Sequence, residues 1–119
     1  MEKANFEDLK IYQESLDYAT LIYRVSQGIP KEEMYGVISQ MRRAAMSVPL
    51  NLAEGQSRLS KADHVRFLLI AKGSLYEMLA IAEICHRQNY MDLEIKQKIR
   101  MMTFSIIKQT QGLINYLKH

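Results

Sequence analysis

Apolar residues recur every three or four positions along almost the whole chain, and no stretch alternates between apolar and polar residues for long enough to predict a strand. This spacing indicates helices over about residues 7–27, 32–55, 60–87 and 92–117. The links between them are short, which favours antiparallel packing of consecutive helices. The pattern therefore predicts an all-α fold, an antiparallel up-and-down four-helix bundle, in a single domain that spans residues 1–119.

Residues at the ends of these stretches support the boundaries. Gly28 and Pro30 supply a stop after the first helix. Ser60 and Asp63 have the spacing of a capping box, with Asp in place of the usual Glu or Gln, and open the third helix. Asp92 is expected to cap the fourth helix. These residues place the three links independently of the apolar pattern.

A proline, Pro49, lies inside the second predicted helix. Proline has no N–H to donate and its ring crowds the carbonyl group of Ala45, one turn earlier, at a cost of about 3 kcal/mol unless neighbouring groups compensate. Polar residues at spacings of 3, 4, 4 and 3 share one face of this helix: Gln40, Arg43, Ser47, Asn51 and Glu54. We expect one network in which Asn and Ser side chains bond the backbone groups that Pro49 frees; a partly solvated flank is the alternative.

Charged residues of this stripe predict contacts with other helices. Arg43 is expected to pair with Glu54 or with a carboxylate from another helix, because a buried charge is costly alone. In the third helix, Gly73 interrupts the pattern, and we interpret it as a tight crossing against another backbone. Glu77 lies one turn further on, so Arg42 or Arg43 is its expected partner. The alternative is a surface carboxylate beside a tolerated glycine.

The third and fourth predicted helices carry more apolar residues than one narrow stripe needs. The additional positions are Leu68, Leu75, Leu79, Phe104, Ile107 and Ile114. A wide core-facing stripe explains them, since an ordinary globular helix has an apolar arc of about 100°. Self-association also explains them, because apolar surface left over after bundle packing must otherwise meet water.

Composition restricts the class of protein. With 48% apolar residues, the 119-residue chain fills one core, and its single cysteine, Cys85, excludes an intrachain disulfide. No apolar run approaches the roughly 18 residues typical of a membrane span, and no N-terminal stretch has the order of a signal peptide. We therefore expect a cytoplasmic protein with no membrane partner.

Basic residues outnumber acidic ones in the middle third of a chain whose net charge is +3. Six of them are candidates for binding nucleic acid and are expected around the link between the second and third helices: Arg42, Arg43, Arg58, Lys61, Arg66 and Lys72. A solvated face with ordinary lysines and arginines is the alternative. An arginine tied to Glu54 or Glu77 would also be lost to phosphate.

Catalytic chemistry finds little support in the sequence. Glu83 and His86 have the Glu-x-x-His spacing of di-iron bundles, but those sites need the motif twice and single glutamates on the other two helices. Cys85 and His86 are neighbours whose side chains point about 100° apart on a helix, so they do not face each other. The sequence has no phosphate-binding glycine loop, zinc-ligand pattern or catalytic triad signature. We predict no metal, no cofactor and no enzyme activity.

Four segments of the chain carry a resemblance to a known family. They are Tyr35-Gly36, Gln40-Met41-Arg42-Arg43-Ala44-Ala45, Ser47-Val48-Pro49-Leu50-Asn51-Leu52-Ala53-Glu54-Gly55 and Ala71-Lys72-Gly73-Ser74-Leu75-Tyr76-Glu77. In this order they resemble the four-helix-bundle family named after proteins encoded in intervening sequences of bacterial 23S ribosomal RNA genes. Phe6, Leu9 and Tyr12 fit the family's N-terminal helix, while Leu50 stands where a small polar residue is commoner.

The resemblance implies a ring of five identical subunits without a known enzymatic activity. Accessory proteins of diversity-generating retroelements look like distant members, and they bind nucleic acid and a reverse transcriptase. Together with the residues above, this favours a non-enzymatic, self-assembling scaffold or binding module, with RNA or a ribonucleoprotein as a further partner. The alternatives are a purely structural oligomer that binds a protein and a metal-carboxylate bundle enzyme.

Overall fold

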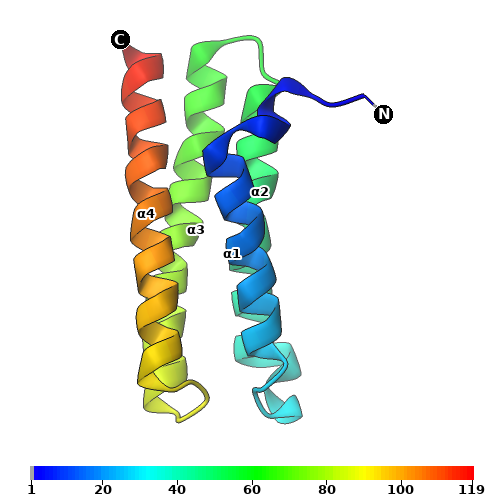
Figure 1. Cartoon of the computed structure of the whole chain (residues 1–119), viewed down its shortest axis with the longest axis vertical. Helices are drawn as coiled ribbons and strands as arrows, with labels where there is room; N and C mark the ends of the chain where they lie inside the picture. The colour runs from blue at the N-terminus through cyan, green and yellow to red at the C-terminus, as the bar shows by residue number, and fades with distance from the viewer. Residues whose placement is uncertain (1) are drawn as a thin grey trace.

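The computed structural model describes residues 2–119, which form four long helices joined by short links (Figure 1). The long helices are α1 (Lys10–Ser26), α2 (Ser39–Gln56), α3 (Lys61–Arg87) and α4 (Leu93–Lys118). Three shorter helical segments precede α1 and α2: η1 (Asn5–Asp8), η2 (Lys31–Glu33) and η3 (Met34–Ile38). The chain thus has the four helices that its apolar pattern predicts.

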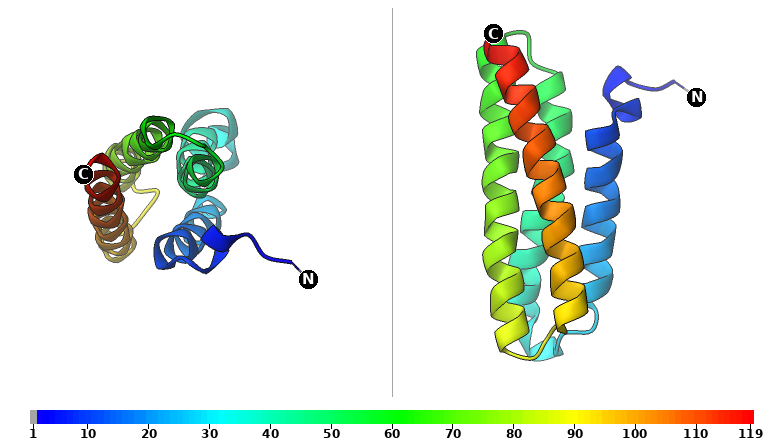
Figure 2. Two further views of the ribbon diagram at one scale, coloured as in Figure 1. Left: turned by 90° about the horizontal axis from the view of Figure 1, so that it is seen from above. Right: turned by 60° about the vertical axis from the view of Figure 1, so that its left-hand side comes forward.

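Consecutive helices run in opposite directions along a body of 43 × 32 × 23 Å (Figures 1 and 2). Seen from above, α1 and α2 lie on one side of the bundle and α3 and α4 on the other, with α2 beside α3 (Figure 2). Helix α3 therefore has α2 on one flank and α4 on the other. Its remaining side faces away from the bundle.

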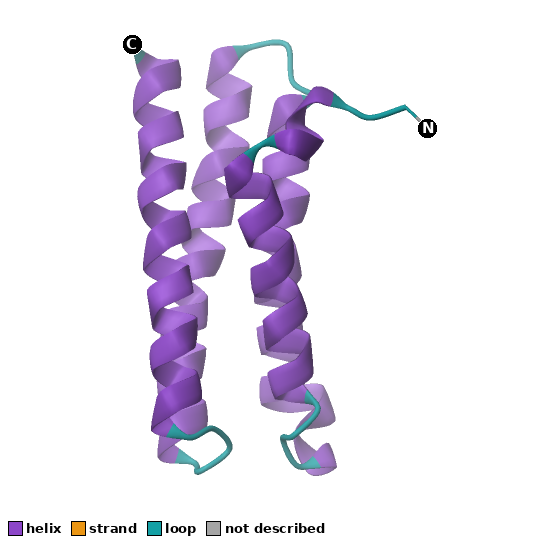
Figure 3. Ribbon diagram, in the orientation of Figure 1, coloured by secondary structure: helices purple, strands orange, loops and turns teal. Residues whose placement is uncertain are grey.

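Helices and links account for all of the described residues, and no strand is present among them (Figure 3). The predicted all-α fold with four helices is confirmed. Within residues 2–119, no helix combines the length and the apolar character that a bilayer crossing requires.

Side-chain caps fix the starts of α3 and α4 at the residues that the sequence predicts. The Ser60 hydroxyl accepts a hydrogen bond of 3.1 Å from the backbone N–H of Asp63, and the Asp92 carboxylate accepts one of 2.8 Å from the N–H of Ile95. Asn89, in the link before α4, has a φ of 61°, a left-handed conformation that Asn tolerates better than most residues. Local chemistry is therefore sufficient to end α3 and to begin α4.

The start of the second helix differs from the prediction. Instead of one helix from Glu32, the chain forms η2 and the wide turn η3 before α2 begins at Ser39. Gly36, inside η3, has φ −112° and ψ −114°, values outside the helical region. A side chain at this position would also place its Cβ 2.7 Å from Oε1 of Glu33. The glycine thus permits a break that the apolar periodicity does not reveal.

The core is apolar and encloses a few hydroxyl groups. Tyr18 of α1 is fully buried, and its hydroxyl lies 2.7 Å from that of Thr103 in α4. Burial raises the pKa of Tyr18 above its usual range. Other fully buried side chains include Ile22, Ile38, Met41, Leu68, Leu75, Met78, Ile99, Ile106 and Ile114. All four long helices contribute to one continuous core.

Most of the additional apolar positions in α3 and α4 belong to this core. The buried ones are Leu68, Leu75, Ile107 and Ile114, with Leu79 partly buried against them. Phe104 differs, since 39% of this residue is exposed. The wide core-facing stripe therefore explains every position of the set except Phe104.

Candidate interaction surfaces

Pro49 is buried inside α2, which continues through it without interruption. The Asn51 side-chain amide donates to the Ser47 carbonyl oxygen at 2.8 Å and to the Ser47 hydroxyl at 2.9 Å. The Ser74 hydroxyl of α3 donates to the same Ser47 hydroxyl at 2.8 Å. These hydrogen bonds join α2 to α3 beside the proline.

The expected repair of the hydrogen bond that Pro49 removes is wrong in one respect. Asn51 reaches back four residues, to Ser47, and not to the Ala45 carbonyl that Pro49 leaves without its usual donor. Among the described residues, no side chain donates to the Ala45 carbonyl. An Asn side chain on a helix meets the turn directly before it, and Ala45 lies further back. The amide therefore stabilises the α2–α3 contact and not the proline's own carbonyl.

The polar stripe of α2 forms three separate groups in place of one network. Near its start, the Arg43 guanidinium donates to the Gln40 amide oxygen at 2.7 Å and to the Glu77 carboxylate of α3 at 2.8 Å. Near its end, Glu54 pairs with Arg58. Arg43 and Glu54 are separated by about 16 Å along the helix axis, so the alternative pairing of these two is wrong. The serine and asparagine group lies between the two ion pairs.

Close packing occurs at Gly55 and not at Gly73. Gly73 is exposed, and a Cβ added there would meet nothing within 4 Å, so the predicted tight crossing is wrong within the subunit. At Gly55, an added Cβ would lie 2.7 Å from Cδ2 of His64. The Nε2 atom of this ring is buried without a hydrogen-bond partner among residues 2–119, and burial lowers the pKa of His64. Gly55 therefore sets how closely α2 and α3 approach at their link.

Five of the six basic candidates are held by other side chains. The pairs are Arg42 with Ser26 (2.8 Å), Arg43 with Glu77 (2.8 Å), Arg58 with Glu54, Arg66 with Asp63 (3.5 Å) and Lys72 with Gln111 (2.6 Å). Lys61 has no such partner in the part of the chain that the structure describes. A guanidinium that already binds a carboxylate is less available to phosphate.

The six basic candidates are also not gathered at the α2–α3 link. Arg42 and Arg43 lie about 22 Å from it along α2, because each helical residue rises about 1.5 Å. At the link itself, the guanidinium carbons of Arg58 and Arg66 lie 4.6 and 4.4 Å from the ring centroid of Phe67. The expectation of one basic patch around the link is therefore wrong for the two arginines of α2 and for Lys72, which lies about 16 Å beyond Lys61 along α3.

Glu83, Cys85 and His86 make structural contacts. The Glu83 carboxylate accepts hydrogen bonds from Lys96 at 2.6 Å and Arg87 at 2.9 Å, and these bonds lower the pKa of Glu83 to about 2. The His86 ring lies 3.0 Å from a carbonyl oxygen of the α3–α4 link. Cys85 is buried, and burial raises the pKa of its thiol. Among the described residues, no group of three or more His, Cys, Asp or Glu is arranged to hold a metal ion.

The side of α3 that faces away from the bundle is apolar. We name this surface the outer line of α3; its members are Leu69, Gly73, Tyr76, Ala80 and Ile84. All five are exposed, and 50% of Leu69, 51% of Tyr76 and 53% of Ile84 are accessible to solvent. The spacings of 4, 3, 4 and 4 repeat the helical period, offset from the core stripe. This surface was not predicted from the sequence, but this second set of helical spacings would have indicated it.

A second apolar surface, the α1–α2 groove, runs past Pro49. It is a hollow of about 410 Å³ lined by Tyr12, Leu16, Ala19, Thr20, Tyr23, Met46, Pro49, Leu50 and Ala53. Met46 and Leu50 are 43% and 59% exposed. Leu50, the residue that departs from the family pattern, thus adds apolar surface to this groove.

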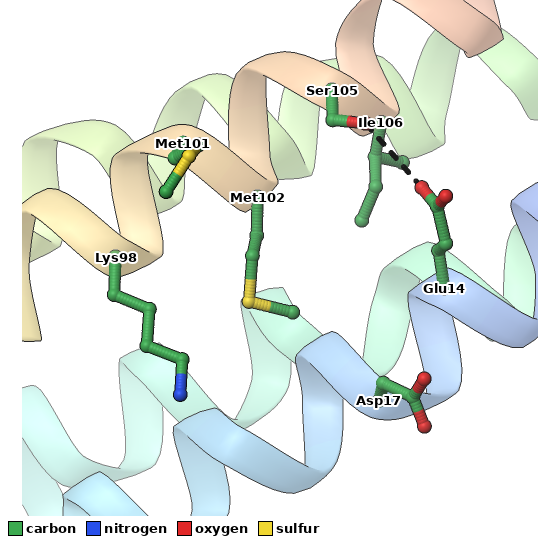
Figure 4. A pocket seen from close by; sticks show the side chains of 7 residues that line it. All are labelled: Glu14, Asp17, Lys98, Met101, Met102, Ser105 and Ile106. Atoms are coloured by element: carbon green, nitrogen blue, oxygen red, sulfur yellow. Dashed lines mark hydrogen bonds between the residues drawn. The ribbon is translucent and has the colours of Figure 1, made fainter.

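A second hollow, of about 300 Å³, lies where α1 faces α4 (Figure 4). It is lined by Glu14, Asp17, Lys98, Met101, Met102, Ser105 and Ile106. The Glu14 carboxylate accepts hydrogen bonds from the Ser105 hydroxyl at 3.4 Å and the Gln109 amide at 2.6 Å, which tie α1 to α4. Lys98 extends from α4 with no carboxylate oxygen of the described residues within 4.0 Å.

Known proteins share the sequence pattern and the fold of this chain. The model of the 23S rRNA-intervening sequence protein family matches residues 7–112. A solved structure from Bacteroides thetaiotaomicron VPI-5482, of a protein with unknown function from the S23 ribosomal protein family, is similar with a TM-score of 0.80 and 24% sequence identity. The alignment covers 87% of this chain and 97% of that chain, and it shows a shared fold. No curated protein matches the chain significantly.

Proposed function

The chain belongs to the 23S rRNA-intervening sequence protein family, and we propose that it is a non-enzymatic, self-assembling scaffold whose subunits meet through the outer line of α3. One observation carries this proposal: α3 is apolar on the side that faces away from its own bundle. A helix at the surface of a soluble bundle keeps that side polar, whereas a helix that is apolar all round is normally buried all round.

The outer line of α3 combines large apolar side chains with space between them. Full burial of a Leu or Ile side chain is worth about 1.5–3 kcal/mol. Leu69, Tyr76 and Ile84 each keep about half of their surface exposed, so contact with a second subunit would bury the remainder. Gly73 and Ala80 lie between them and have no atoms beyond Cβ, which permits the close approach of another helix.

The α1–α2 groove is the partner surface that the proposal assigns to the outer line. The groove is apolar, exposes Met46 and Leu50, and belongs to the half of the bundle opposite α3 and α4 (Figure 2). A contact between two different surfaces is head-to-tail, and it gives a ring when the rotation between subunits closes. The ring of five that the family resemblance implies is an assembly of this kind.

A further partner, RNA or a ribonucleoprotein, is the second part of the proposal. The six basic candidates give it limited support, because five of them already bind other side chains. A purely structural oligomer that binds a protein would assemble in the same way but would have no affinity for RNA. A metal-carboxylate enzyme has the least support, since Lys96 and Arg87 occupy the Glu83 carboxylate.

Sedimentation equilibrium tests the assembly. We expect the wild-type protein to sediment as a multiple of 13.9 kDa. Leu69→Glu and Ile84→Glu, at opposite ends of the outer line, should each sediment as a single subunit, because assembly would bury an unpaired carboxylate. Leu93→Glu makes the same change at a leucine that is 52% exposed at the start of α4, outside the outer line and the α1–α2 groove, and as the matched control it should keep the wild-type mass.

Two results would contradict the proposed assembly. A wild-type mass of 13.9 kDa would remove it, and so would an unchanged mass in both outer-line variants. Leu50→Glu tests the assigned partner surface and is expected to dissociate the protein in the same way. Circular dichroism at matched concentration checks that every variant keeps the helical content of the wild type.

A further inference from the structure

An excess of positive charge lies on α4, apart from the six basic candidates. From Leu93 to His119 the chain has five basic side chains, Lys96, Lys98, Arg100, Lys108 and Lys118, against one carboxylate, Glu94. Averaging the charge over thirds of the sequence hides this excess, because acidic residues before α4 fall within the same third.

The basic residues of α4 differ from those at the α2–α3 link in their partners. Lys96 binds Glu83 at 2.6 Å. The basic residues of α4 with no carboxylate oxygen within 4.0 Å, among those described, are Lys98, Arg100, Lys108 and Lys118. These groups can therefore bind a phosphate oxygen without first breaking an ion pair. The arginines at the link would have to break one.

An aromatic ring lies among these charges. Phe104 is 39% exposed, and the guanidinium carbon of Arg100 lies 5.4 Å from its ring centroid. Met101, one turn before Phe104, is 70% exposed. An open hollow of about 510 Å³ beside the ring is lined by Lys10, Met101, Phe104, Ser105, Lys108 and Gln109. The ring is therefore accessible next to cationic groups.

We propose that this surface, the α4 strip, binds single-stranded nucleic acid; its residues are Lys98, Arg100, Met101, Phe104 and Lys108. Lys98 and Lys108 are about 15 Å apart along the helix, a span that a short run of phosphates covers. Aromatic rings stack on unpaired bases of any sequence, and an arginine beside the ring adds a cation–π contribution. Bases inside a duplex do not present their faces to such a ring, so the strip fits a single strand.

The inference rests on the proposed assembly for the strength of binding. One strip supplies few phosphate contacts, but an assembly repeats the strip once per subunit, and linked strips hold one strand by avidity. The strip and the outer line of α3 share no residue. Each surface can therefore be altered without changing the other.

Fluorescence anisotropy with a labelled single-stranded RNA of mixed sequence tests the strip, and DNA of the same sequence is a second probe. We expect Lys98→Glu plus Lys108→Glu to lower the affinity at least about tenfold, because each reversed charge repels phosphate. Arg58→Glu plus Lys61→Glu makes the same change of charge at the α2–α3 link and should lower it less than about threefold. Lys98→Arg plus Lys108→Arg keeps the charge and should keep the affinity.

Salt and base stacking give two further readouts. Lys98→Gln plus Lys108→Gln removes two phosphate contacts, so the slope of log K against log salt concentration should fall by about 1.4. Phe104→Leu should lower the affinity for RNA about fivefold or more, because one stacked base is lost. The same variant should bind inorganic polyphosphate, which has no bases, as the wild type does.

Several results would overturn the inference. The wild-type protein could bind neither the RNA nor the DNA. Lys98→Glu plus Lys108→Glu could leave the affinity unchanged, or Arg58→Glu plus Lys61→Glu could lower it by the same factor. A lower mass of the α4 variants in sedimentation equilibrium would assign the strip to assembly. Tighter binding to phosphatidylserine vesicles than to RNA, through the same lysines, would make it a membrane surface. Because Ile84→Glu tests assembly by mass alone, failure of the assembly and failure of the strip remain separate observations.

Discussion

Two sides of α3 differ in how far contacts within one subunit pair their polar groups and cover their apolar surface. Toward α2, polar groups are paired: Ser74 donates to Ser47, and Glu77 accepts from Arg43. Away from the bundle, the outer line leaves about half of the surface of Tyr76 in water. The serine and glutamate groups toward α2 are therefore paired within the subunit, with the buried Nε2 of His64 as an exception among the described residues, whereas the outer line is left uncovered.

This contrast separates two kinds of stability. Changes on the side toward α2 should alter the free energy of unfolding of one subunit at any protein concentration. Changes in the outer line should alter association, whose contribution to stability depends on protein concentration. The Leu69→Glu variant, which is expected to be a single subunit, provides the background in which the first kind is measured alone.

The largest expected effect on the subunit is that of Asn51→Leu. The substitution removes the amide that donates to the Ser47 carbonyl and hydroxyl, so the Ser47 hydroxyl keeps Ser74 as its donor and loses Asn51. In the Leu69→Glu background, we expect the free energy of unfolding in urea to fall by about 1–3 kcal/mol. Asn115→Leu, the same change at an exposed position of α4, should stay within about 0.5 kcal/mol. Equal stabilities of the two variants would contradict the paired side of the comparison.

Alanine substitutions at two glycines should change the free energy of unfolding by smaller amounts, and in opposite directions from each other. Gly55→Ala forces a methyl group against His64, at 2.7 Å from Cδ2, and should cost about 1–2 kcal/mol. Gly73→Ala meets nothing within 4 Å in the subunit and should stabilise it by up to about 1 kcal/mol, because alanine is the better helix former. Both values refer to urea unfolding in the Leu69→Glu background.

A bulkier change at Gly73 sharpens the comparison in the assembled protein. Gly73→Leu should weaken association in sedimentation equilibrium, because the side chain fills the space that another helix needs. Gly112→Leu is its control: this glycine of α4 is also exposed, and an added Cβ also meets nothing within 4 Å. An equal shift of mass in both variants would remove the special position of Gly73 in the outer line.

The fold could be predicted because its signals are local. Apolar spacing places the helices, and Ser60 and Asp92 cap α3 and α4 within one turn of themselves. The break at Gly36 was missed, because a helix and a helix with one distorted turn have the same apolar pattern. Helix boundaries that depend on backbone conformation, and not on a side-chain pattern, are therefore the ones at which the structure differs from the prediction.

The interaction surfaces were less predictable, because they depend on which residues meet across helices. Arg42 and Arg43 are equivalent in the sequence, and the rotation of α2 gives Glu77 to Arg43 and Ser26 to Arg42. Likewise, the sequence marks Gly73 as unusual, but the ring of His64 packs on Gly55. Whether a basic residue has a carboxylate partner is a property of the folded chain. That property distinguishes α4 from the link, which composition alone cannot do.

A third side of α3, toward α4, adds charge to the comparison and gives the smallest expected effect. Lys96 and Arg87 hold the pKa of Glu83 at about 2, below its usual 4.5. A carboxyl group whose pKa is lower in the folded state stabilises that state above the unfolded pKa and loses this contribution as the pH falls to the folded value. In the Leu69→Glu background, Glu83→Gln should therefore be less stable than its parent at pH 7, and urea titrations should show the difference shrinking between about pH 4.5 and pH 2. Glu94→Gln, at an exposed carboxylate without an ion pair among the described residues, is the matched control and should differ from its parent by less than about 0.5 kcal/mol at pH 7. If the difference in free energy of unfolding between Glu83→Gln and its parent stays constant down to pH 2, its cause is packing and not charge. The outer line would then be the one side of α3 that differs from the side toward α2.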